Sequence, residues 1–260
     1  SSNGAFHSLY EERDFELAGS KLAFSPGGAR IALSIGWRPS QLAMANVSGG
    51  RLMYVATRPI QAYDPIWAGG DKIVFSGHTL NGKRGGTYSI RPDGSGFRRL
   101  FDRVSLAASR NLAEFVTTGR SKGENRLLLL DRKGESSVLL DRSKEFYFRD
   151  PEISADGRWI VYERYFDPTG KYSGTRQGDL FIVRSDGTRR RRLTSGLRDR
   201  YPAFSPDGRW VAFARHNRTT MTSNLFALHV DRPGMVHRIT RGKNNYYYEV
   251  IWGRRQQSGK

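Results

Sequence analysis

A repeated segment constrains the fold more than any other feature of the sequence. Its clearest copy spans residues 201–215, where Tyr-Pro-Ala-Phe is followed by Ser-Pro-Asp-Gly and then by Arg-Trp-Val-Ala-Phe-Ala-Arg. Pro presets φ for a turn and Gly tolerates positive φ, so Ser-Pro-Asp-Gly predicts a tight turn. The apolar run that follows is too short for a helix. The segment therefore predicts a β-hairpin.

Weaker copies of this segment recur along the whole chain. If the residue before each turn is taken as an anchor, successive anchors lie 39 to 51 residues apart, at Phe24, Trp67, Leu106, Ile153, Phe204 and Trp252. A period of about 40 to 50 residues with strands and Asp-Gly turns is typical of a β-propeller with one four-stranded blade per repeat. We expect five complete blades, at residues 18–58, 59–101, 102–141, 142–196 and 197–241.

A sixth repeat begins at residues 246–252, but residues 254–260 carry no apolar second strand. Two apolar segments near the start, 6–10 and 14–17, match the third and fourth strands of a blade. We expect residues 242–260 and 4–17 to share one composite blade, because closing the ring removes open sheet edges. The prediction is a single all-β domain, a six-bladed propeller of four-stranded antiparallel blades.

Composition fits a single domain and adds one functional hint. With 260 residues, 37% of them hydrophobic, the chain can bury a full core. The net charge is +18, and the basic residues are 34 Arg and 9 Lys. Arg binds carboxylate and phosphate groups in a bidentate manner, so an acidic partner is one interpretation. A solvated basic surface with no partner is the other.

Other classes are excluded or left open by simple counts. The chain has no Cys, which excludes disulfides and thiolate metal sites without setting a compartment. No apolar run reaches the roughly 20 residues that a membrane-spanning helix needs. The first four residues, 1–4, lack the basic and apolar regions of a signal peptide. We therefore predict a soluble chain with no transmembrane segment.

Segments 202–213, 179–187 and 192–194 resemble the repeat of TolB-type six-bladed β-propellers. The resemblance covers essentially the whole chain, is clearest in the fourth and fifth repeats, and is poorest at 106–110, which lacks Pro, Asp and Gly. It implies a propeller without the α/β domain that precedes it in TolB, in a periplasmic or exported protein. Family members include partner-binding proteins, peptidase lids and a few lyases, so the resemblance is specific for fold only.

Catalytic and cofactor motifs are weak. Residues 119–123 fit Gly-x-Ser-x-Gly, but they link two expected strands, whereas a nucleophile elbow needs a strand-to-helix turn. Residues 77–84 nearly fit a phosphate-binding loop, but Arg84 replaces the Ser or Thr that would bind magnesium. The five His show no metal-ligand spacing. We predict no catalytic residues, no metal site and no cofactor.

Charged residues are expected around the axial mouth of the ring. The innermost strand of each blade starts three residues before the anchor, and charged residues occupy five of those six positions: Lys21, Asp64, Arg103, Asp150 and Glu249. The acidic members would either gather a divalent cation or pair with Lys21 and Arg103. Pairing is favoured, because buried charges without partners are costly.

Topology predicts one face rich in aromatic and basic residues. In an up-and-down blade, the loop after the second strand and the connection between blades emerge on the same face. Tyr and Arg are common at interface hot spots, and long loops on a rigid scaffold often bind partners. We define the expected binding face by Tyr147, Phe148, Arg149, Tyr165, Tyr172, Arg176, Tyr201, Arg215, His216, Tyr246, Tyr247 and Tyr248.

Taken together, these features predict a non-catalytic binding propeller. It would engage a protein partner through the binding face or the axial mouth, in an envelope or exported assembly as the resemblance implies. Binding of a polyanion, such as an acidic polysaccharide or nucleic acid, is the alternative. An enzyme with an axial metal is the third hypothesis, and no set of residues here has the spacing that such chemistry needs.

Overall fold

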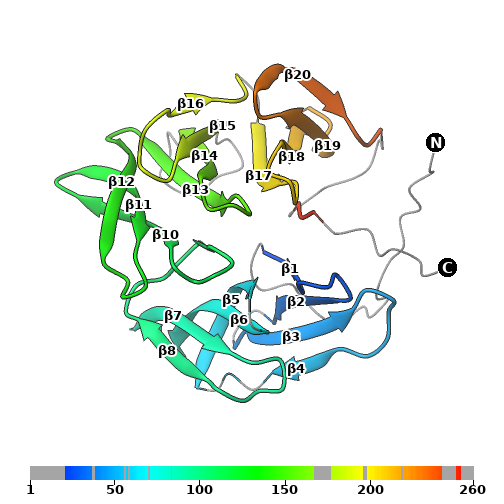
Figure 1. The fold of residues 1–260 in the computed structure, drawn as a ribbon. Helices are drawn as coiled ribbons and strands as arrows, with labels where there is room; N and C mark the ends of the chain where they lie inside the picture. The colour runs from blue at the N-terminus through cyan, green and yellow to red at the C-terminus, as the bar shows by residue number, and fades with distance from the viewer. Residues whose placement is uncertain are drawn as a thin grey trace.

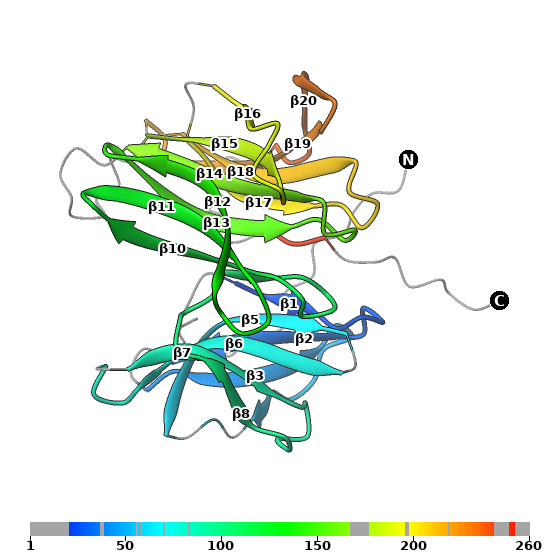
Figure 2. The ribbon, with the colours of Figure 1, turned by 60° about the vertical axis from the view of Figure 1, so that its left-hand side comes forward.

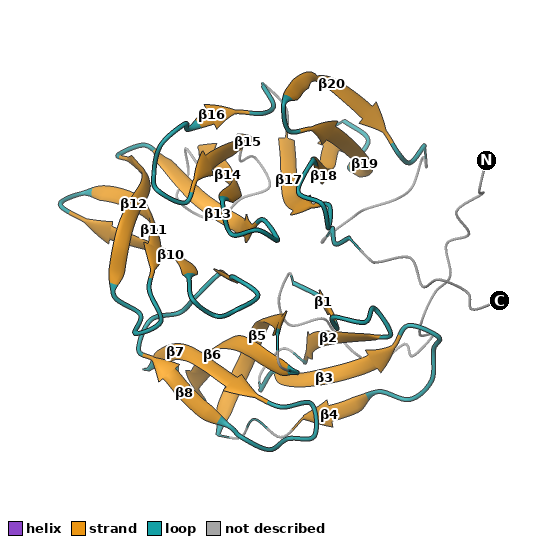
Figure 3. Ribbon diagram, in the orientation of Figure 1, coloured by secondary structure: helices purple, strands orange, loops and turns teal. Residues whose placement is uncertain are grey.

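Five four-stranded antiparallel sheets surround a central axis in the computed structural model (Figure 1). The structure describes residues 21–252 except 37–38, 56, 58, 70, 83, 167–176, 196–197, 218 and 242–249. Strands connected by loops make up this part of the chain, as Figure 3 shows by colour. Within each sheet the strands follow chain order, so the first lies nearest the axis and the fourth lies at the rim (Figure 1). The predicted all-β propeller architecture is therefore confirmed.

Each sheet is one blade, and we number the blades along the chain. The strands of blades 1 and 2 are β1 (Ala23–Phe24), β2 (Arg30–Ile35), β3 (Gln41–Asn46), β4 (Met53–Val55), β5 (Ile60–Ala68), β6 (Lys72–Thr79), β7 (Gly85–Ile90) and β8 (Arg98–Phe101). Those of blade 3 are β9 (Ala107–Ala108), β10 (Phe115–Ser121), β11 (Glu124–Leu130) and β12 (Ser136–Ser143). Those of blades 4 and 5 are β13 (Phe146–Ile153), β14 (Trp159–Phe166), β15 (Gln177–Arg184), β16 (Arg191–Arg192), β17 (Arg198–Phe204), β18 (Trp210–Asn217), β19 (Thr222–His229) and β20 (Arg232–Arg238).

The described residues form five blades, where six were expected. The composite blade predicted from residues 4–17 and 242–260 lies outside the described part of the chain, apart from 250–252. Those three residues pack against blade 5: Trp252 Nε1 donates to the carbonyl of Ala203 at 2.8 Å, and Val250 joins a cluster with Ala212 and Ala214. Blade 1 carries its own apolar cluster, with Leu33 and Ile35 among its members.

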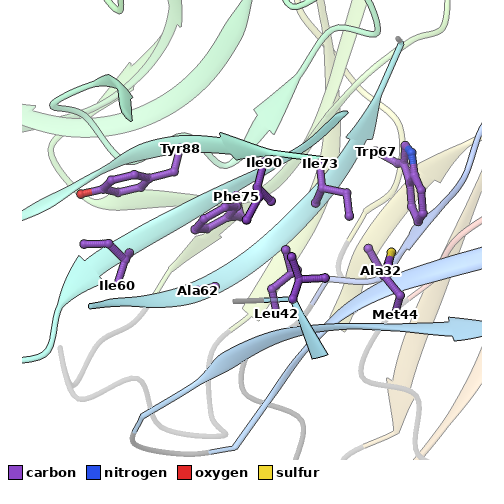
Figure 4. Packing of buried hydrophobic residues seen from close by; sticks show 11 residues of the cluster. Ala32, Leu42, Met44, Ile60, Ala62, Trp67, Ile73, Phe75, Tyr88 and Ile90 are labelled. Carbon is purple, nitrogen blue, oxygen red and sulfur yellow. The ribbon is translucent and has the colours of Figure 1, made fainter. Parts of the chain in front are cut away.

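Apolar side chains between blades form the core. Side chains alternate across a strand, so each sheet has two faces to bury. The cluster between blades 1 and 2 combines Leu42 and Met44 with Ile73 and Phe75, which meet across the boundary of the two sheets in Figure 4. Similar clusters join blades 3 and 4 and blades 4 and 5, and Figure 2 shows these neighbouring sheets stacked face to face. The blades therefore hold one another in place.

The repeat in blade 3 is displaced by two residues from its expected register. In blade 5 the amide of Ser205 donates to Trp210 O, and in blade 3 the matching bond runs from Ser109 to Glu114 O. Ser109 therefore corresponds to Ser205, and the anchor of blade 3 is Ala108 instead of Leu106. The weak turn sequence concealed this shift, because Leu112, at φ +55°, occupies the position that Gly takes in the turns of blades 1, 4 and 5.

The innermost strands of blades 2, 4 and 5 share one irregularity. Asp64, Asp150 and Tyr201 have φ values of 49°, 46° and 54°, and each precedes a proline. The strand register shifts at the same place in all three blades. Proline cannot donate a hydrogen bond to the sheet, so it is tolerated where a bulge interrupts the pairing. The bulge turns the start of each strand and fixes where these three residues lie relative to the axis.

Candidate functional site

A cavity of about 440 Å³ occupies the centre of the ring. All five blades and residues 250–252 line it. Much of its wall is apolar or aromatic, with Phe24, Trp67, Phe204 and Trp252 contributed by different parts of the chain. Its charged lining residues are Lys21, Arg110, Asp150 and Glu152. We call this space the axial cavity.

Lys21 ties two blades together across the axis. Its Nζ donates to the carbonyl of Pro151 in blade 4 at 2.9 Å and to the carbonyl of Leu106 at the start of blade 3. Arg110 lies on the turn of blade 3, where its carbonyl accepts a 2.8 Å bond from the amide of Gly69 in blade 2. Both cations are therefore held by contacts between blades.

Glu152 is the most perturbed carboxyl in the axial cavity. Burial raises its pKa to about 7, against the opposing influence of a hydrogen bond from the amide of Phe204 and of the positive charges of Lys21 and Arg110. Its Oε2 lies 2.5 Å from that amide nitrogen. Desolvation disfavours the charged form of a carboxyl, and here it outweighs both cations. Glu152 therefore changes charge near neutral pH, inside the cavity.

The predicted axial residues separate into three locations. Lys21 and Asp150 line the axial cavity. Asp64 lines a second cavity of about 480 Å³, beside Tyr63 and His78 of blade 2. Arg103 lies between blades 2 and 3 because of the two-residue shift in blade 3, and its Nη1 donates to Ser136 Oγ at 2.8 Å. Glu249 lies outside the described residues.

Glu152 was missed by the sequence reasoning, although a signal was present. Glu152 stands immediately before its anchor. Four of the other repeats carry an uncharged small or apolar residue at this position, namely Ala23, Ile66, Ala203 and Ile251, and the third repeat carries Ser105. A single charged residue at an otherwise uncharged repeat position is not needed to build the blade, so it indicates a role other than a structural one. The same comparison fails for Arg110, since the register of blade 3 was misplaced.

Part of the expected binding face is buried between strands and blades. Phe148 is 5% exposed and packs edge to face against Tyr162 at 6.0 Å between ring centroids, in the core between blades 3 and 4. Tyr165 is 2% exposed and stacks on Tyr147, its cross-strand neighbour, at 5.5 Å. Phe148 and Tyr165 therefore stabilise blade 4 and are not presented to solvent, whereas Tyr147 is half-buried.

Two basic members of this face, Arg149 and Arg215, lie near carboxylates. Arg215 makes a bidentate contact with the buried Asp199, at 2.7 and 3.1 Å, and lies over the Phe226 ring at 4.7 Å from its centroid. Desolvation opposes the charge of Arg149, but the nearby charges of Asp150 and Glu163 help to raise its pKa. The charge of Arg215 is therefore neutralised by Asp199 of the same blade.

Tyr201 joins the binding face to the axial cavity. It lines the cavity, and its ring meets that of His216 edge to face at 6.1 Å. Both residues are half-buried. The remaining predicted residues of this face lie outside the described part of the chain, namely Tyr172, Arg176, Tyr246, Tyr247 and Tyr248.

The motifs considered for catalysis belong to hairpins and loops. The Gly-x-Ser-x-Gly residues run along β10 into a two-residue turn, where Lys122 and Gly123 have φ values of 50° and 78° and Ser121 pairs with Glu124. This hairpin turn lacks the helix that follows a nucleophile elbow. Across the described ranges, no three His, Asp or Glu side chains gather as ligands for a metal ion.

The search of solved structures finds proteins of the same architecture. A putative TolB from Agrobacterium tumefaciens superposes with a TM-score of 0.67 at 20% identity, covering 86% of this chain and 79% of that one. TolB from Acinetobacter baumannii gives 0.62 at 16% identity, with 82% and 53% covered. This chain has the TolB-type propeller fold. It spans about half the length of the Acinetobacter protein.

The fold is shared with proteins of other kinds. Oligogalacturonate lyase from Vibrio parahaemolyticus superposes with a TM-score of 0.59 at 10% identity, covering 89% of this chain and 68% of the lyase. No family model matches the sequence, and no curated protein matches it. Among the described residues, no helix has the length and apolarity required to cross a membrane.

Proposed function

We propose that this propeller is a non-catalytic binding protein that holds an extended segment of a protein partner in the axial cavity. The proposal rests on one observation: five blades and residues 250–252 all contribute aromatic or charged residues to the lining of one cavity of about 440 Å³. Ligand sites combine apolar walls with a few placed polar groups in this way. Glu152, Lys21 and Arg110 would fix the orientation of the bound segment.

The binding face extends this site. Tyr201 belongs to both surfaces, and its contact with His216 continues the cavity onto blade 5. A partner entering the ring at Tyr201 would therefore meet Tyr147 and Arg149 on the neighbouring blade. As part of this proposal, the predicted loop residues of the binding face, Tyr172, Arg176, Tyr246, Tyr247 and Tyr248, would contact the same partner. An envelope or exported assembly is proposed for the complex from the likeness to TolB alone.

A protein partner is favoured over a polyanion at this face. Polyanion binding needs cations whose charge is available to phosphate or carboxylate groups. The guanidinium of Arg215 is already satisfied by Asp199, and the charges of Asp150 and Glu163 act on Arg149. The axial cavity itself balances Lys21 and Arg110 against Asp150 and Glu152. A cavity that combines acidic and basic residues with aromatic walls suits a peptide better than a uniformly charged polymer.

Linear peptides selected by phage display against the whole protein test this proposal. Ala155 lines the axial cavity on the turn of blade 4, so Ala155→Trp obstructs it. We expect this variant to weaken enriched peptides at least tenfold in fluorescence anisotropy, about 1.4 kcal/mol. Ala29→Trp, an exposed change on the corresponding turn of blade 1 outside the cavity lining, is the matched control.

Two results would contradict the proposal. One is that enriched peptides bind Ala155→Trp as tightly as the unchanged protein, which would place their site elsewhere. The other is that no peptide is enriched while polygalacturonate or single-stranded DNA binds with an affinity that falls steeply with salt, as expected for a polyanion site.

A further inference from the structure

A third cavity lies between blade 3 and the segment that connects it to blade 2, and it shares no lining residue with the axial cavity. Its volume is about 520 Å³, within the usual range of small-molecule sites. The structure describes every residue that lines it, from the segment between the blades and from β10, β11 and β12. We call it the interblade cleft.

No strand of blade 2 lines the cleft, whose second wall is the connecting segment at Arg103, Val104 and Leu106. The apolar cluster between blades 2 and 3, with Val74, Phe101, Phe115 and Leu130, lies outside the cleft lining. Strand β8 ends at Phe101, so blade 2 supplies no further rim strand beyond that point. On the facing wall Gly119 has no side chain, and a Cβ placed there would meet only Leu128 Cδ1, at 3.9 Å.

The charge of the cleft is of one sign. Arg103, Arg120 and Arg126 line it, and no lining residue is acidic. Glu124 lies outside the lining, where its Oε2 is 3.8 Å from Arg126 Nη2 and 3.9 Å from Arg142 Nη1. One carboxylate therefore stands beside two guanidinium groups, and Arg103 and Arg120 add to the excess of positive charge.

The side chain of Arg126 has a buried donor that lacks a hydrogen-bond acceptor. Its Nε is buried and has no hydrogen-bond partner among the described residues. An unsatisfied buried donor, especially a charged one, costs free energy that a bound acceptor would recover. Guanidinium groups match carboxylate and phosphate oxygens in bidentate geometry. The acceptor that Arg126 lacks is therefore best supplied by an oxyanion.

The scaffold around the cleft is built to hold these cations. Thr87 Oγ1 in blade 2 donates to the carbonyl of Arg103 at 2.6 Å, and Thr117 Oγ1 in blade 3 donates to the carbonyl of Val104 at 2.6 Å. Ser136 Oγ then accepts from Arg103 Nη1 at 2.8 Å. Arg126 is held within the sheet, between Gly119 and Arg142. Preorganised donors lower the entropic cost of binding.

We propose that the interblade cleft binds a small organic oxyanion. Its carboxylate or phosphate group would lie between Arg103 and Arg126, with Arg120 and the hydroxyl groups of the wall supporting it. Its carbon skeleton would lie on the half-exposed side chains of Val104, Leu106 and Leu128. The site shares no cation with the axial cavity and does not depend on the function proposed for it.

Isothermal titration calorimetry of the whole protein tests the proposal with three probes: inorganic phosphate, succinate and glucose 6-phosphate. We expect saturable binding of at least one probe with a Kd below about 10 mM. A preference for succinate identifies a carboxylate ligand, and a preference for glucose 6-phosphate over inorganic phosphate identifies a phosphorylated organic one. Arg126→Gln and Arg103→Gln should each weaken the bound probe at least tenfold, or about 1.4 kcal/mol.

Arg142→Gln is the matched control, because it removes the same charge from a residue that does not line the cleft. Arg142 is the cross-strand neighbour of Arg126 and, like Arg126, lies near Glu124. Arg142→Gln should leave the affinity within about twofold, since a solvent-exposed charge is largely screened by salt. Gly119→Val should abolish binding while keeping all three arginines, because its side chain enters the cleft. This variant also decides the question if Arg126→Gln proves unstable.

The proposal is overturned by either of two outcomes. The first is that none of the three probes gives saturable binding. The second is that Arg142→Gln weakens binding as much as Arg126→Gln while Gly119→Val has no effect, because the protein would then attract anions only through its overall charge.

Discussion

The carboxylate of Glu152 in blade 4 accepts a hydrogen bond from the backbone amide of Phe204 in blade 5, with 2.5 Å between Oε2 and the nitrogen. The two residues are 52 positions apart in the chain. This contact fixes a titratable group at the boundary between two blades and inside the axial cavity. Because burial raises its pKa to about 7, the group links the stability of the ring to pH near neutrality.

Stability should fall as the pH rises from about 4.5 to about 7. In this window the folded state binds a proton at Glu152 that the unfolded state has released, because the folded pKa is about 7 and the ordinary value is 4.5. The contribution to the slope reaches at most about 1.4 kcal/mol per pH unit. Urea unfolding followed by circular dichroism should show a flatter profile for Glu152→Gln. The exposed Glu145→Gln is the control, and an unchanged slope in Glu152→Gln would contradict the assignment.

Removing Lys21 should raise the pKa of Glu152 further. The positive charge of Lys21 opposes the effect of burial, so Lys21→Met leaves desolvation with less opposition. The pH window in which stability falls should then extend above 7. Lys21→Arg keeps the charge and should stay close to the unchanged protein. A carbon-13 NMR titration of the Glu152 carboxyl measures the shift directly, and a pKa that is equal in both variants would argue against the interaction.

Arg215→Met should destabilise the protein by about 3 to 5 kcal/mol, because it leaves the fully buried carboxylate of Asp199 without its partner. Arg158→Met is the matched comparison, since its pair with Asp156 is exposed, 3.9 Å long and worth at most about 1 kcal/mol. Chemical denaturation of both variants checks the difference. The double change Asp199→Leu with Arg215→Met should recover part of the loss, and a loss of equal size in Arg158→Met would refute the distinction.

Two glycine replacements should have opposite effects. Gly208 has a φ of 70° and Gly27 does not fall in the positive range, although a Cβ at either position meets nothing within 4 Å. Gly208→Ala should therefore cost about 1 to 2 kcal/mol of backbone strain alone. Gly27→Ala should be neutral or stabilise by about 0.4 to 1 kcal/mol, through the entropy of the unfolded chain. Thermal unfolding of both variants suffices, and equal shifts in Tm would show that turn strain is not the cause.

The sequence by itself determined the blades, because turns and alternating strands are local. Ser205, Asp207 and Gly208 make a turn within a few residues: Ser205 Oγ accepts from the amide of Trp210, and Asp207 accepts from the amide of Arg209. Such bonds join residues that are only a few positions apart, so the local sequence specifies them, and five blades and most of their strands could be predicted. The displaced register of blade 3 could not, since Leu112 stands at the position where glycine marks the turns of blades 1, 4 and 5.

Only the tertiary structure decided which charges meet. Lys21 and Pro151 are 130 residues apart, and their contact depends on how whole blades pack around the axis. The packing between blades also buries Phe148, and Arg103 lines the interblade cleft instead of the expected axial mouth. Strand pairing within a blade brings Arg215 against Asp199 and Tyr165 against Tyr147. Repeat position specifies a place along a strand, whereas the cavity that a side chain enters depends on the bulges and on the neighbouring blade. For this reason Glu152 and Arg126 emerge as the residues of interest from the folded chain.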